Sequence, residues 1–289
     1  MASGPPIPPP PIEMPLPRVQ EHDGVRTYSA VPYTVSFGQR PVEMDIHLPK
    51  HGKGPYPVVI YVHGGAFLFG DRRDPGPMYW EHADNQFTSL PREGIAVASV
   101  DYRLAHEATY PAQLEDLMAA QQFLVARADE LGIDPTRIGV WGESAGAHLG
   151  MLLALHGAPG CPPIAAIVDW FGPSDLGLPF GDLPIPGPTP EERLIGGSLA
   201  DNADLVAHAS PVNHVGADSP PILIVHGTGD TVVPVHHSHA LETALREAGA
   251  QVEVLWLDDA DHAWIGAPDA ASEAQAATYA YLRRQLLPT

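Results

Sequence analysis

The sequence predicts an α/β protein with a mostly parallel sheet of eight strands and helices on both faces. Short runs that are apolar throughout and rich in Val and Ile recur along the chain, as is typical of parallel strands buried on both faces. Between them lie stretches in which apolar residues repeat at spacings of three and four, the periodicity of helices that pack on a sheet. Hydrophobic residues make up 44% of the 289 residues, which is enough for a large core. A chain of this length often forms one α/β unit.

The expected strands and helices follow one another in regular order. Residues 31–37 and 42–48 alternate in polarity and predict two strands, with Gly38 and Gln39 as the turn between them. The buried strands are expected at residues 58–62, 95–100, 138–141, 164–170, 222–225 and 252–257. Helices are expected at residues 111–131, 145–156, 235–248 and 271–287.

Two segments depart from this order. Residues 1–30 are expected to form a Pro-rich N-terminal arm, because prolines crowd residues 1–17 and favour extended polyproline structure. Residues 31–289 are expected to form one catalytic domain. Within it, residues 172–220 consist of proline-rich loops with one short helical stretch near residues 191–199. An insertion at that point predicts a small cap over the functional site.

Composition and charge exclude several classes of function. The formal net charge is −20 and only 15 residues are Lys or Arg, so a nucleic-acid partner is not expected. The single cysteine, Cys161, allows no intrachain disulfide. We find no basic start followed by an apolar run and no stretch of about 18 apolar residues, so we expect neither a signal peptide nor a membrane span. A cytoplasmic location follows by default, and a homodimer stays open.

The strongest chemical signal is a serine with a glycine two residues before it and another two residues after it. Gly142-Glu143-Ser144-Ala145-Gly146 matches the pattern G-x-S-x-G. A predicted strand precedes the motif and a predicted helix follows it, which is the setting that a nucleophile elbow requires. Glycines flank the serine because side chains there would collide with the neighbouring strand and helix. We therefore predict that Ser144 is a nucleophile; the alternative is a Gly-rich turn with a passive serine.

A second glycine-rich segment follows the strand predicted at residues 58–62. His63-Gly64-Gly65-Ala66-Phe67 resembles the HGGG motif of esterases and lipases, with alanine at the third glycine position. Backbone N–H groups in such a turn stabilise the oxyanion that forms when a serine attacks a carbonyl group, and each is typically worth about 3 kcal/mol. We assign these donors to Gly65, Ala66 and Ala145, and we expect His63 to anchor the loop.

The general base and its partner are expected after the last two strands. Asp230 follows the strand at residues 222–225, and His262 follows the strand at residues 252–257. The order Ser, Asp, His is the order of this triad in folds that carry a nucleophile elbow, and the carboxyl ends of parallel strands meet at one edge. His262 can then take the serine proton while Asp230 orients the imidazole. The rival acids, interpreted as loop-forming residues, are Asp258, Asp259 and Asp261.

Taken together, these motifs resemble the α/β-hydrolase esterases, in particular the hormone-sensitive-lipase-like group and its feruloyl and acetylxylan esterase branch. The resemblance covers most of residues 31–289 and also includes Asp101-Tyr102-Arg103-Leu104-Ala105, Tyr110-Pro111-Ala112-Gln113 and Ala209-Ser210-Pro211-Val212. It implies an α/β-hydrolase fold and a serine carboxylesterase whose substrate is a small-molecule ester. Members of that group often have a helical N-terminal cap, whereas this chain is rich in proline there.

The expected activity is the hydrolysis of short-chain carboxylic esters through an acyl-enzyme, with no metal or organic cofactor. Short acyl chains are expected because the insertion at residues 172–220 is too small for a large lipid-binding lid. Phe67, Phe171 and Trp264 are candidates for the substrate pocket, with core packing as the alternative. Two other functions stay open: an amidase such as an aryl-formamidase, and a non-catalytic binding protein on the same fold.

Overall fold

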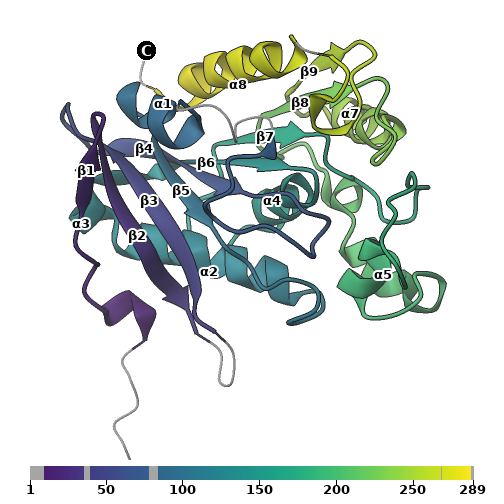
Figure 1. Ribbon diagram of the computed structural model, residues 1–289, viewed down its shortest axis with the longest axis horizontal. Helices are drawn as coiled ribbons and strands as arrows, with labels where there is room; N and C mark the ends of the chain where they lie inside the picture. The colour runs from purple at the N-terminus through teal and green to yellow at the C-terminus, as the bar shows by residue number, and fades with distance from the viewer. Residues whose placement is uncertain (1–9, 36–39, 78–83, 268, 288–289) are drawn as a thin grey trace, which may run out of the picture.

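In the described residues, nine strands form a single sheet at the centre of the fold (Figure 1). The computed structural model describes residues 10–35, 40–77, 84–267 and 269–287. The spatial order of the strands is β1-β2-β3-β5-β4-β6-β7-β8-β9. Their bounds are β1 Gln20–His22, β2 Val25–Thr34, β3 Val42–Pro49, β4 Tyr56–Val62, β5 Ala96–Val100, β6 Ile133–Glu143, β7 Ala166–Trp170, β8 Ile222–Gly227 and β9 Val252–Leu257.

The sheet is antiparallel at its beginning and parallel over the rest. β1, β2, β3 and β5 pair antiparallel in that order, whereas every pairing from β5 through β4 to β9 is parallel. Parallel strands need crossover connections, and helices supply most of them here. The carboxyl ends of β4, β6, β8 and β9 therefore meet at one edge, where the loops that follow them lie side by side.

The prediction of eight strands was wrong by one strand. The additional strand, β1, lies in the segment expected to be an arm, and its three residues are all exposed, so no buried apolar run marks it in the sequence. β2 also begins earlier than expected, at Val25. An irregularity near Ala30, which has a φ of 55°, interrupts its alternation. The turn expected at Gly38 and Gln39, and residues 1–9 of the Pro-rich arm, lie outside the described residues.

Helices cover both faces of the sheet. On one face lie α2 (Ala112–Ala126), α4 (Ala145–His156) and α7 (His236–Ala248), whose apolar residues belong to the same hydrophobic cluster as Val58, Ile60 and Val62 of β4. On the other lie α1 (Gln86–Arg92) and α8 (Ala270–Leu286), whose apolar residues belong to a second hydrophobic cluster with Val59 and Tyr61 of the same strand. Successive β4 residues thus face opposite helix layers, which explains why the strand is apolar throughout.

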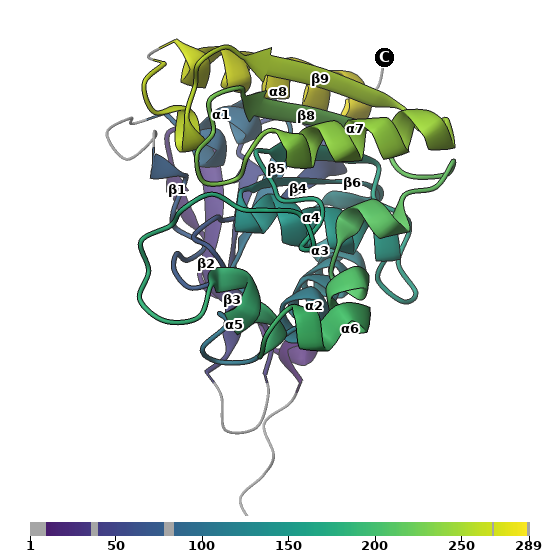
Figure 2. The ribbon, with the colours of Figure 1, turned by 90° about the vertical axis from the view of Figure 1, so that its right-hand side faces the viewer.

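The segment expected to be a cap contains two short helices. α5 (Pro190–Ile195) and α6 (Ala203–His208) lie on the same side of the sheet as α2 and away from α8 (Figure 2). Thr189 begins α5 as part of a capping box with Glu192, and Gly196 ends it in a left-handed conformation. In the described part of the N-terminal segment, a 3-10 turn at Pro11–Glu13 precedes β1, and there is no helical cap.

Candidate active site

Ser144 lies on the sharp turn between β6 and α4. Its backbone has a φ of 52° and a ψ of −120°, a conformation that is strained for a residue with a side chain. The backbone N–H of Ser144 donates to the carbonyl of Trp170 at the end of β7, at 2.9 Å, which fixes the turn to the neighbouring strand. The strained turn therefore presents the serine hydroxyl at the carboxyl edge of the sheet.

The glycines on both sides of Ser144 make this turn possible. A Cβ atom added to Gly146 would lie 2.1 Å from the carbonyl oxygen of Val62, and one added to Gly142 would lie 2.4 Å from the backbone nitrogen of Ala147. Neither neighbour is a flexible side chain, so neither could move aside. The packing of the elbow against β4 and α4 thus explains both fixed glycines of the motif.

Three side chains that are far apart in the sequence form one hydrogen-bonded row. The Oγ of Ser144 lies 3.1 Å from Nε2 of His262, and Nδ1 of the same imidazole lies 2.8 Å from Oδ2 of Asp230. Asp230 follows β8, and His262 opens a 3-10 turn after β9. Because Nδ1 faces a carboxylate, it carries the proton, which leaves the lone pair of Nε2 directed at the serine hydroxyl. This arrangement can move a proton from Ser144 to His262.

Asp230 is buried, and both of its carboxylate oxygens accept hydrogen bonds. Its Oδ1 accepts the backbone N–H groups of Val232 and Val233, at 2.9 and 2.8 Å, while its Oδ2 faces both His262 and His226. Burial alone would raise the pKa of Asp230, but hydrogen bonds from His226 and His262 outweigh burial and hold the pKa below its usual range. The carboxyl group is therefore an anion at neutral pH, as an imidazole partner requires.

His226 is a second partner of Asp230 that sequence reasoning missed. Its Nε2 lies 3.2 Å from Oδ2 of Asp230 and 2.8 Å from the carbonyl oxygen of Val233, so Nε2 carries the proton. Its Nδ1 lies 2.6 Å from the hydroxyl of Ser238 on α7 and accepts the hydrogen of that hydroxyl. The only sequence signal was a histidine at the end of β8, four residues before Asp230, and a core residue could have produced the same signal.

The rival acids near His262 occupy other positions than the one beside the imidazole. Asp261 accepts the backbone N–H groups of Thr231, at 2.8 Å, and of His262, at 2.7 Å, so it joins the two loops without touching the imidazole. Asp258 and Asp259 are exposed in the turn after β9.

The loop after β4 brings backbone donors to Ser144. Gly65, Ala66 and Phe67 all have positive φ values, of 108°, 53° and 62°. Within the described residues, the backbone N–H groups of Gly65, Ala66 and Ala145 donate to no protein acceptor, and Ala66 and Ala145 line a cavity with Ser144. His63 lies behind this loop, where its Nδ1 is 2.7 Å from the carbonyl oxygen of Gly64 and its ring stacks on Tyr102.

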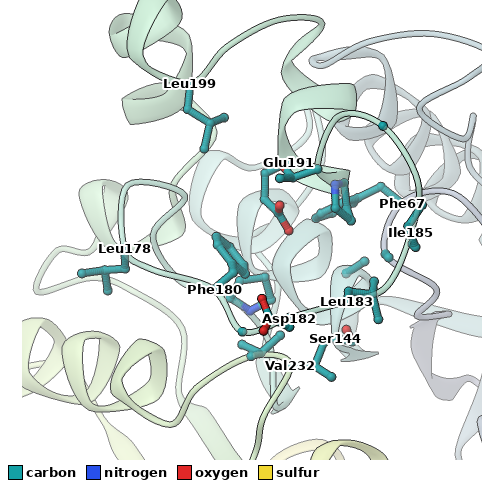
Figure 3. Close-up of a pocket in the computed structure, with 18 residues that line it drawn as sticks. Phe67, Ser144, Leu178, Phe180, Asp182, Leu183, Ile185, Glu191, Leu199 and Val232 are labelled. Atoms are coloured by element: carbon teal, nitrogen blue, oxygen red, sulfur yellow. The ribbon is translucent and has the colours of Figure 1, made fainter.

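Two cavities meet at Ser144. The cap cavity, of about 420 Å³, extends from Ser144 and Phe67 to α5 and its preceding loop (Figure 3). The His262 cavity, of about 350 Å³, is lined by Ser144, His262 and Phe171 among others, and it is nearly all apolar. Trp264 was expected in the pocket, but it is not among the described residues that line either cavity. It is buried, with its ring 4.7 Å from that of Phe171, because the turn after His262 directs it into the core.

Glu143, next to the nucleophile, is almost wholly buried. Its carboxyl group accepts a hydrogen bond from the hydroxyl of Tyr61 at 2.8 Å, and it lies so close to Gly76 that a Cβ atom added there would be 2.6 Å from both of its oxygens. Burial raises the pKa of Glu143 to about 8, with a further contribution from Asp74, although the Tyr61 hydrogen bond acts in the opposite direction. Glu143 is therefore mostly protonated near neutral pH. It is unsuited to serve, like Asp230, as an anionic partner of the imidazole.

This raised pKa predicts a pH dependence of stability. Glutamate in the unfolded chain has a pKa of about 4.3. The folded state therefore holds a proton that the unfolded state releases, and its stabilising effect is complete below that pKa and lost as the pH rises through 8. We expect the free energy of unfolding of the wild type, relative to Glu143→Gln, to fall from pH 5 to pH 8 by up to about 1.4 kcal/mol per pH unit. Denaturant titrations at each pH measure this difference, and two parallel curves would contradict it.

A metal-holding cluster and a membrane-spanning helix are both absent from the part of the chain that is described. There, no group of three or more His, Cys, Asp and Glu side chains is arranged to hold a metal ion. We also find, among the same residues, no helix with the length and apolar run that a membrane crossing requires.

Comparison with known families gives one clear match. The family model BD-FAE matches residues 44–245, a stretch that begins in β3 and ends in α7. It therefore includes the loop after β4, Ser144 and Asp230, while His262 lies beyond it.

Curated relatives are esterases of bacteria and plants. Carboxylesterase NlhH of Mycobacterium tuberculosis is 30% identical over 269 residues, which cover 88% of this chain and 82% of NlhH. Esterase LipQ of the same organism is 30% identical over 218 residues, which cover 72% of this chain. The chain spans only about half the length of several relatives. The match covers 50% of LipQ and 47% of LipM, a probable carboxylic ester hydrolase of the same organism.

Solved structures that resemble this chain are also esterases. A truncated carbohydrate esterase from gut microbiota superposes with a TM-score of 0.78 at 27% identity, over 94% of this chain and 100% of that chain. A bacterial heroin esterase superposes with a TM-score of 0.72 at 29% identity, over 92% of this chain and 86% of that one.

Proposed function

The chain belongs to the BD-FAE family of α/β-hydrolase esterases, and from this premise we propose that it is a serine carboxylesterase. Ser144 is the nucleophile, His262 is the general base, and Asp230 orients and stabilises the imidazole. The observation that carries the proposal is the row of contacts from Oγ of Ser144 through His262 to Asp230, at 3.1 and 2.8 Å. This geometry suits a base within hydrogen-bond reach of the proton that it removes.

The first half of the reaction forms an acyl-enzyme. The Oγ of Ser144 attacks the ester carbonyl carbon while its proton passes to Nε2 of His262. The carbonyl oxygen becomes an anion, which the N–H groups of Gly65, Ala66 and Ala145 stabilise. The bond to the leaving alcohol then breaks, the alkoxide takes the proton from Nε2, and the alcohol departs.

The second half regenerates the enzyme. A water molecule gives a proton to Nε2 of His262 and attacks the acyl carbon, and the resulting tetrahedral species collapses to release the carboxylic acid and restore the proton to Ser144. Throughout, Asp230 remains an anion and keeps the proton of the imidazole on Nδ1. All the groups that these steps need are side chains and backbone amides of the chain.

The substrates that we propose are esters of short acyl chains. The cap cavity and the His262 cavity together offer room for a small ester, and the cap consists of short helices and loops. Long acyl chains would need an extended apolar tunnel or a larger lid.

A series of p-nitrophenyl esters from acetate to laurate tests this proposal. We expect kcat/KM to be highest at the short end and to fall steadily towards laurate. Faster hydrolysis of N-formylkynurenine than of every ester would instead identify an amidase. A protein that hydrolyses none of these compounds would favour a binding role on the same fold.

A further inference from the structure

The charged side chains that line the cap cavity all have the same sign. Among the described residues that line it, only Asp182 and Glu191 are charged, and both are acidic. Asp182 is exposed, whereas Glu191 is 8% exposed and directs its carboxyl group into the space between Phe67 and Phe180 (Figure 3). A buried carboxyl group in the wall of a substrate cavity is unlike the apolar groups around it.

Glu191 has few partners of its own. Within the described residues it forms no ion pair, and the polar groups that act favourably on its carboxylate are its own backbone N–H and the hydroxyl of Thr189. The nearest cation along the chain, Arg193, donates instead to the carbonyl oxygens of Pro186 and Pro188. A carboxylate offers about four acceptor positions, so Glu191 can accept further donors. Burial raises its pKa, as expected for a carboxyl group without a cation beside it.

The position of His262 decides which half of the ester meets Glu191. His262 lines the other cavity, and its Nε2 must give a proton to the departing alcohol. The alcohol therefore leaves on the side of the His262 cavity, and the acyl group extends into the cap cavity. Apolar walls such as Phe67, Phe180 and Leu178 suit the stem of that acyl group, and Glu191 meets a polar end.

We propose that Glu191 determines acyl specificity: the enzyme favours esters whose acyl chain ends in a hydrogen-bond donor, a hydroxyl or ammonium group. Acyl chains that end in a methyl group leave the carboxyl group without a new partner, and those that end in a carboxylate bring two negative charges together. This inference rests on the esterase activity proposed above and adds a substrate class to it.

Methyl esters with the same chain and different terminal groups test the inference. Methyl 6-hydroxyhexanoate, methyl heptanoate and monomethyl pimelate differ only in a terminal hydroxyl, methyl or carboxylate group, and a pH-stat follows their hydrolysis. We expect kcat/KM to decrease in that order for the wild type. Glu191→Leu should lower the hydroxyl-to-methyl ratio by roughly 10- to 100-fold, the range for a hydrogen bond to a charged group. Methyl 3-hydroxypropanoate and methyl butanoate repeat the comparison at a shorter length.

Two further variants keep the test decisive. Glu191→Gln retains an acceptor but removes the charge, so it should mainly reduce the discrimination against pimelate, and it serves if the leucine variant does not fold. Glu192→Gln removes the same charge one residue away, outside the cavity lining. It should leave unchanged both the hydroxyl-to-methyl ratio and the methyl-to-carboxylate ratio of kcat/KM.

The outcomes separate the two proposals. Unchanged ratios in both Glu191 variants, with hydrolysis that still depends on Ser144, would overturn the role of Glu191 and leave the esterase assignment standing. A wild type that hydrolyses none of the five esters would overturn both.

Discussion

Replacement of Ser144 with alanine is expected to lower kcat for p-nitrophenyl acetate by roughly 10⁴- to 10⁶-fold, the range measured when triad members are removed from a serine hydrolase. The variant loses the oxygen that forms the acyl-enzyme, while the N–H donors of the loop after β4 remain. The residual rate should therefore still exceed that of the reaction in water. Steady-state kinetics and circular dichroism of the purified variant check the result and the fold.

A serine outside the row is the matched control for this variant. Ser198 lies in the cap outside the residues that line either cavity, so Ser198→Ala should hydrolyse the ester at the wild-type rate. A Ser144→Ala protein that is folded and retains a tenth or more of the wild-type kcat would exclude Ser144 as the nucleophile.

Replacement of Asp230 with asparagine is expected to lower kcat by about 10⁴-fold, as the same change does in a serine protease triad. The amide Nδ2 of asparagine would donate to Nδ1 of His262, and the imidazole proton would then move to Nε2. In that tautomer Nε2 cannot accept the proton of Ser144. The change is nearly isosteric, so we expect the loss in kcat with little change in KM.

Asp261→Asn is the control for Asp230→Asn. Asp261 is adjacent to His262 in the sequence, but among the described residues its carboxyl group accepts hydrogen bonds from Thr231 and from the backbone N–H of His262. Its variant should lose far less activity than Asp230→Asn. If Asp261→Asn were the more damaging of the two, the row would have to be assigned to the other acid.

The elements that could be predicted from the sequence are those whose pattern is both long and regular. β9 and α4 have the bounds expected of them, Val252–Leu257 and Ala145–His156, because a run that is apolar except for Glu253 and a helix of mainly small and apolar residues mark them. α1 was missed, because it has only seven residues and contains Pro91. The helix expected at residues 111–131 is divided at Arg127 into α2 and α3 (Ala128–Leu131), a break that apolar spacing does not reveal.

The candidate site was predictable to the extent that topology alone fixes it. Parallel strands place the residues that follow them at one edge, so Ser144, Asp230 and His262 could be expected to meet there. The contact of His226 with Asp230, and the burial of Trp264 in the core, depend on the conformation of the loops after β8 and β9. Glu191 gave no signal at all, because its position in a cavity depends on how the cap folds over Ser144.

The central claim is that His262 and Asp230 activate Ser144 for nucleophilic attack. The most direct test is to treat the protein with a serine-directed organophosphate and locate the adduct by peptide mass spectrometry. We predict a single adduct on Ser144, formed much more slowly in Asp230→Asn than in the wild type. An adduct on another residue, or an inactivated enzyme in which Ser144 is unmodified, would contradict the account.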